Sequence, residues 1–170
     1  GHGLVRIRDA FRDDGLCPRG DLHALCGRRH GRRRRQAHCR AIWETAASLP
    51  GLRVPVVPED IGHAGYKCYV FVDEAVANDP VADVRDRIMN AIVAEGVPCF
   101  SGSCSEVYLE KAFTDLGLAP EERLPVARSL GDSALMFLVH PTLTAEEVEK
   151  TCSVLHTAVG RVMSAGRSSY

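Results

Sequence analysis

A run of six consecutive apolar residues at positions 134–139 limits the possible folds of this chain more than any other feature. His140 and Pro141 close the run, and a short apolar run with such an ending is typical of a β-strand. Residues 66–72 are rich in aromatic and β-branched side chains and predict a second strand, central in its sheet. Residues 97–100 predict a short extended piece. These patterns place a small sheet at the centre of the fold.

Amphipathic helices are predicted between and after these strands. Apolar residues recur at helical spacing over residues 81–93. Asp79 is a suitable N-cap, Pro80 suits the first turn, and Gly96 is a natural end.

The last predicted helix begins with a capping box, in which Thr144 is the N-cap and Glu147 is the N3 residue. Other helices are predicted at residues 35–49, 105–113 and 121–130. We therefore predict an α+β fold, with a small sheet of about three strands covered on one face by helices.

Charge is distributed unevenly along the 170 residues. Residues 1–41 contain eleven Arg and four Asp, whereas the net charge of the whole chain is −1. Residues 1–35 also lack sustained periodicity. We therefore expect a basic arm at 1–35, poorly ordered or from a non-native reading frame, a domain at 36–165 and a tail at 166–170. Because no initiator Met is present, we expect a fragment, a processed product or a partial reading frame.

Seven cysteines are scattered along the chain without a repeating spacing. No signal peptide is visible, and no apolar run approaches the length of a membrane span. We expect reduced thiols, a cytoplasmic location and no bound metal. A thiol-based redox protein or a zinc protein stays an alternative, because several side chains near the N-terminus can bind metal. These are Cys17, Cys26, His30, His38 and Cys39.

Small hydroxyl and thiol residues follow the short extended piece. They can leave backbone N–H groups and space for a ligand, or they can form a tight turn with two inert cysteines. The residues are Cys99, Phe100, Ser101, Gly102, Ser103 and Cys104. His63, just before the predicted strand 66–72, is either an anion contact or a satisfied histidine at a strand edge.

Three blocks of sequence, in order, resemble one enzyme family. The first runs from Leu49-Pro50-Gly51 through His63 and Tyr66 to residue 72, the second is 96–103, and the third is 124–148. Their order and spacing over residues 36–165 resemble the C-terminal domain of the DegT/DnrJ/EryC1/StrS aminotransferases. Those are pyridoxal-phosphate enzymes of the aspartate-aminotransferase fold, which typically aminate keto sugars on nucleotides.

The resemblance implies a supporting role for this chain. In the family a preceding large domain holds the cofactor and its Schiff-base lysine, and none of Lys67, Lys111 and Lys150 matches that lysine. We therefore expect no catalytic or cofactor-binding residue here, and no activity from the chain alone. In the intact enzyme we expect pyridoxal 5'-phosphate, an amino-acid donor, a keto-sugar substrate, and a large domain or homodimer partner.

The resemblance also implies which residues line the substrate cleft. They are those of the 99–104 segment, with His63 and Tyr66. Family members often carry a histidine in the segment matching 99–103, and this sequence has none there.

A different class of function stays open. The arginines at 28–29 and 32–35 predict a non-enzymatic binding module that meets an acidic partner through its basic arm. Nucleic acid is not favoured as that partner, because no aromatic residue is interleaved with the arginines.

Overall fold

The computed structural model describes residues 22–77 and 79–165, with side chains for 30–75, 77 and 79–165. A four-stranded antiparallel sheet in the order β1-β2-β4-β3 forms its centre, and β2 and β4 are the inner strands. The strands are β1 (Leu52–Arg53), β2 (Cys68–Val72), β3 (Cys99–Phe100) and β4 (Ala134–Phe137). The α-helices are α1 (Leu22–Ala47), α2 (Val81–Ala94), α3 (Lys111–Thr114), α4 (Pro125–Ser133) and α5 (Ala145–Ala165).

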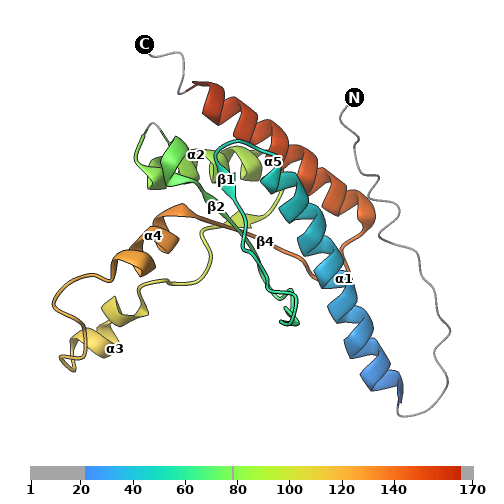
Figure 1. Cartoon of the computed structure of the whole chain (residues 1–170), viewed down its shortest axis with the longest axis horizontal. Helices are drawn as coiled ribbons and strands as arrows, with labels where there is room; N and C mark the ends of the chain where they lie inside the picture. The colour runs from blue at the N-terminus through green and yellow to red at the C-terminus, as the bar shows by residue number, and fades with distance from the viewer. Residues whose placement is uncertain (1–21, 78, 166–170) are drawn as a thin grey trace.

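Only one face of the sheet contributes to the core. Along β2 the side chains of Cys68, Val70 and Val72 are buried, whereas Tyr69 and Phe71 are partly exposed, as the alternation of a strand requires. The buried face packs against apolar residues of α1, α2 and α5, and α1 and α5 lie side by side (Figure 1). The structure therefore confirms the predicted α+β fold with helices on one face.

The helix α1 begins at Leu22, well before the predicted beginning near residue 35. Its C-terminal half is anchored in the core by Cys39, Ile42 and Ala46. Once such a half is formed, each added residue gains a hydrogen bond, and Arg is a good helix former. The N-terminal half therefore becomes helical without an apolar pattern, and so periodicity could not reveal it. Residues 1–21 of the predicted basic arm and the tail at 166–170 lie outside the described residues.

Three other helix predictions differ in detail from the structure. The N-cap of α2 is Pro80, because the carboxylate of Asp79 instead accepts a 2.5 Å hydrogen bond from Arg87. The predicted helix 105–113 is divided by Glu110, whose backbone is extended. The helix predicted at 121–130 is α4, which begins at Pro125 and continues through Gly131.

The strand β1 was missed, because the two prolines of residues 52–65, Pro55 and Pro58, indicated a connector. Its two residues pair with β2, Leu52 with Val72 and Arg53 with Phe71. None of the helices in the described part of the chain has the length and apolar character that crossing a bilayer requires.

Candidate functional site

The segment after β3 meets β2 across the open face of the sheet. Tyr69 of β2 and Phe100 of β3 are both register partners of Met136, the residue of β4 that lies between them. The Tyr69 side chain crosses β4 and reaches the loop that begins after Phe100. At Gly102 the loop turns with a φ of +93°, and a Cβ there would lie only 2.5 Å from Tyr69 Cε1. A glycine is therefore required both by the backbone and by the contact.

Hydrogen bonds join Ser103 to two residues of the β2 region. Lys67 Nζ donates to Ser103 Oγ at 2.7 Å, and the Tyr69 hydroxyl donates to the same oxygen at 3.3 Å. The Ser103 backbone N–H donates to the Tyr69 oxygen at 3.1 Å. Burial alone raises the pKa of Tyr69, but the two hydrogen bonds with Ser103 and the charge of Lys67 outweigh it, so the pKa is lowered.

His63 belongs to a second group, on the segment that leads into β2. Its carbonyl accepts a 2.5 Å hydrogen bond from the Gln36 side chain of α1, and its Nδ1 accepts from Gly65 N at 3.1 Å. Its ring packs against the indole of Trp43, with 5.5 Å between ring centroids. Gly65 is buried at a φ of +62°, against the backbone of α1.

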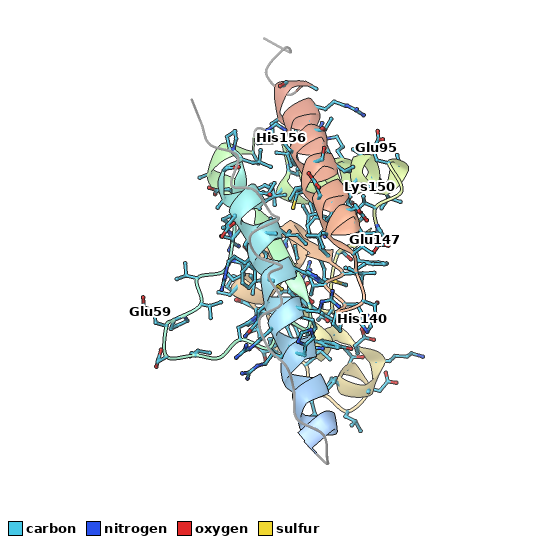
Figure 2. The ribbon with its side chains drawn as sticks, turned by 90° about the vertical axis from the view of Figure 1, so that its right-hand side faces the viewer. Glu59, Glu95, His140, Glu147, Lys150 and His156 are labelled. Atoms are coloured by element: carbon cyan, nitrogen blue, oxygen red, sulfur yellow. The ribbon has the colours of Figure 1, made fainter. Side chains whose placement is uncertain are left out.

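Trp43 connects the two groups, because its indole N–H donates to the carbonyl of Tyr69 at 2.9 Å. Tyr66 lies at the bend before β2, with 78% of its side chain exposed. The structure thus brings Gly102 and Ser103 to Lys67 and Tyr69, whereas His63 packs on α1. The outer end of the segment between β1 and β2, marked by Glu59, projects away from the body of the molecule (Figure 2).

The two cysteines of the 99–104 segment differ. Cys99 is buried, and burial raises the pKa of its thiol to about 12, so it is unsuited to nucleophilic attack. Cys104 is exposed, and its Sγ lies 3.5 Å from a carboxylate oxygen of Glu110. Among the described residues, no group of three or more His, Cys, Asp or Glu is placed to hold a metal ion. Of the five metal-capable side chains noted in the sequence, Cys17 lies outside the described residues, as does the side chain of Cys26.

A cluster of three side chains, Glu106, Tyr108 and Arg123, forms a clamp within the segment between β3 and α4. The guanidinium of Arg123 donates two hydrogen bonds to the carboxylate of Glu106, one of them 2.9 Å long. The Tyr108 hydroxyl donates to the same carboxylate at 2.6 Å and accepts from Leu124 N at 2.9 Å. The Arg123 hydrogen bonds first, and then that of Tyr108, lower the pKa of Glu106 to about 2.

Sequence reasoning did not nominate Lys67, Tyr69, Trp43 or Gln36 for the site. One signal was present. Lys67 and Tyr69 are two positions apart and so belong to one face of the strand, opposite to the face of the apolar residues Cys68 and Val70. No sequence pattern indicated the roles of Trp43 and Gln36, because both contacts depend on how α1 packs against the rest of the domain. Lys150 lies on α5 near Glu95, at the end of α2 (Figure 2), and its Nζ is 3.5 Å from the position of a Cβ at Gly96.

Comparison with solved structures identifies the domain. An aminotransferase from Psychrobacter cryohalolentis is 42% identical and matches 82% of this chain with a TM-score of 0.72. This domain belongs to the DegT/DnrJ/EryC1/StrS family of aminotransferases. The resemblance seen in the sequence is thereby confirmed.

Two structures of lower identity share the same aminotransferase fold. A DegT DnrJ EryC1 StrS aminotransferase from Brucella abortus is 22% identical, matches 80% of this chain and has a TM-score of 0.63. NtdA from Bacillus subtilis, solved with bound cofactor PMP, is 16% identical, matches 76% of the chain and has a TM-score of 0.60. No protein-family model and no curated protein sequence matches the chain.

The chain spans about a third of the length of these aminotransferases. It covers 37% of the Psychrobacter chain, 33% of the Brucella chain and 28% of NtdA. What this family domain does within a whole enzyme is therefore a matter for proposal.

Proposed function

We propose that this domain is the C-terminal part of a pyridoxal-phosphate-dependent aminotransferase, which moves an amino group from an amino acid to a keto sugar carried on a nucleotide. The observation that carries the proposal is the 42% identity to the Psychrobacter aminotransferase over most of the chain. The free state of the five described cysteines supports a cytoplasmic location.

The residues of this chain do not by themselves fit the cofactor. Pyridoxal phosphate supplies an electron sink when it is bound, and it requires a lysine, an acid beside its pyridine nitrogen and a phosphate cradle. The described lysine nearest the candidate site, Lys67, is held by the Ser103 hydroxyl, and it takes part in none of the ion pairs among the described residues. A large domain, in the same chain or a homodimer partner, must supply the cofactor site, and this chain alone is inactive.

The role of this domain is to form one wall of the substrate cleft. Residues 100–104, with His63 and Tyr66, would line that wall and supply hydrogen bonds and shape. Cys99, which was also expected there, is buried in the core. The support is their position: Gly102 and Ser103 contact Tyr69, which lies on the face of the sheet that the helices leave open, where a large domain can dock. The exposed Phe100 contributes apolar surface to the same face.

A domain exchange tests this proposal. Residues 36–165 would replace the matching domain of the Psychrobacter aminotransferase, with the unaltered enzyme as control. We expect the chimera to bind pyridoxal phosphate and to aminate a nucleotide-linked keto sugar, and the isolated chain to do neither. A chimera that is folded and loaded with cofactor but transfers no amino group to such sugars would overturn the proposal.

A binding module is the second candidate function. It is favoured by Arg32, Arg33 and Arg34, which are exposed on α1. Under this proposal an acidic protein docks on the N-terminal half of that helix. Replacing the three arginines by glutamine in the whole chain would then abolish capture of an acidic partner. The first proposal does not need these arginines, because the chimera begins at residue 36 and is expected to be active without them.

A further inference from the structure

We propose that Lys67 and Ser103, positioned by Tyr69, form a subsite that binds a carboxylate or phosphate group of the substrate. The biological meaning of this subsite rests on the proposed function, because that function makes the 99–104 loop a substrate wall. The chemistry itself rests on the hydrogen bonds of these three side chains alone.

The three residues together form a donor set. A serine hydroxyl has one donor and two acceptor sites, and Ser103 Oγ accepts from both Lys67 and Tyr69. Its own O–H is therefore left to donate outward. An ammonium group has three donors, and Lys67 uses one of them on Ser103. Two N–H groups and one O–H group remain for a ligand, which must therefore be an acceptor.

The Tyr69 hydroxyl is a positioning group. It donates to Ser103 Oγ and accepts from Ser103 N, so both of its functions are used within the cluster. Its ring lies against Gly102 on one side and stacks on Phe71, with 6.2 Å between ring centroids. The serine is thus held in place before any ligand arrives, which lowers the entropic cost of binding.

The positive charge of Lys67 has no carboxylate partner among the described residues. All five ion pairs found there are made by arginines: Arg85, Arg87, Arg123, Arg128 and Arg161. A lysine that is fixed by a hydroxyl instead of a carboxylate keeps its charge available. Because an ammonium forms charge-assisted hydrogen bonds with carboxylate and phosphate oxygens, the acceptor that best fits this site is an anion.

The test uses three sugars that differ in charge. Glucuronate carries a carboxylate, glucose 1-phosphate carries a phosphate, and glucose carries neither. Each would be titrated into the isotopically labelled chain while the backbone amide signals of Gly102 and Ser103 are followed by NMR. We expect saturable shifts with at least one anionic sugar and none with glucose. The anionic sugar that binds more tightly shows whether the subsite takes a carboxylate or a phosphate.

Two substitutions complete the test. Lys67→Met is expected to weaken anion binding about tenfold or more, since a hydrogen bond to a charged group contributes about 1.5–3 kcal/mol. Lys67→Arg should retain most of the binding. Lys111→Met, which removes an exposed lysine at the start of α3, is the matched control and should bind like the unaltered chain. Equal shifts with all three sugars, or unchanged anion binding in Lys67→Met, would overturn the proposal.

The result does not depend on catalysis. Anion binding at Lys67 together with an inactive chimera would refute the proposed function and leave the subsite standing. An active chimera in which Lys67→Met changes neither anion binding nor the KM for its substrate would refute the subsite alone.

Discussion

Trp43 of α1 donates its indole N–H to the backbone carbonyl of Tyr69 on β2, with 2.9 Å between nitrogen and oxygen. The same ring packs against His63. One side chain therefore fixes the long helix to the strand that carries Tyr69 and to the segment that leads into that strand. The geometry of the candidate site depends on this connection, although Trp43 itself is not one of the residues that the loop contacts.

Replacing Trp43 by phenylalanine keeps an aromatic ring and removes the donor. We expect the free energy of unfolding to fall by about 1 kcal/mol, the usual contribution of one such hydrogen bond. Trp43→Ala also removes the packing against His63 and should lower it further. Both variants lose the single tryptophan of the chain, so tryptophan fluorescence cannot follow their unfolding. Urea unfolding followed by circular dichroism measures the stability of both. A Trp43→Phe variant as stable as the original would show that the carbonyl of Tyr69 does not need this donor.

The clamp between Glu106 and Arg123 predicts a pH dependence of stability. The pKa of Glu106 is lowered from 4.5 to about 2 in the folded chain. Its stabilising contribution is therefore complete above about pH 5 and is lost as the pH falls toward 2. The difference in unfolding free energy between the original chain and Glu106→Gln should shrink over that window. Glu122→Gln, at a neighbouring exposed acid, is the control, and a difference that does not change with pH would contradict the assignment.

The parts of the fold that periodicity describes were predictable from the sequence. The inner strands β2 and β4 and the helices α2 and α5 follow from apolar spacing over a few residues. The open face of the sheet does not follow from that spacing, because residues 66–72 are apolar on both faces of the strand. The strand β1 was not predictable, because its two residues depend on pairing with β2, and the adjoining turn at Gly51 accepts a hydrogen bond from Asp73 N.

The candidate site was predictable only in part. The 99–104 segment stood out by its small residues, but its partners Lys67 and Tyr69 are far away in the sequence. They meet it only because β4 separates β2 from β3 and sets Tyr69 and Phe100 opposite the same residue, Met136. Strand order and register are long-range properties, which a local pattern does not encode.

The capping box at the start of α5 was predicted and is present. Glu147 N donates to Thr144 Oγ1 at 3.2 Å, and Thr144 N donates to the Glu147 carboxylate at 2.7 Å. Thr144→Ala should lower the free energy of unfolding by about 1 kcal/mol. Thr151→Ala is the matched control, because that hydroxyl only bonds back to Glu147 O within the helix, and its loss should be close to neutral. Thermal unfolding of both variants measures this, and equal effects would contradict the importance of the cap.

Alanine substitutions at three glycines distinguish backbone strain from steric contact. Only one of these glycines, Gly102, lies in the site loop. Gly102 combines a φ of +93° with the contact to Tyr69, Gly117 has a φ of +65° and open space, and Gly62 has open space without a positive φ. We expect alanine to cost nearly nothing at Gly62, about 1 kcal/mol at Gly117, and more than that at Gly102, where the Tyr69 ring must move. Urea unfolding of the three variants gives this order. If Gly102→Ala cost no more than Gly117→Ala, the ring of Tyr69 would be free to yield, and the loop would not be held by it in the way that its hydrogen bonds indicate.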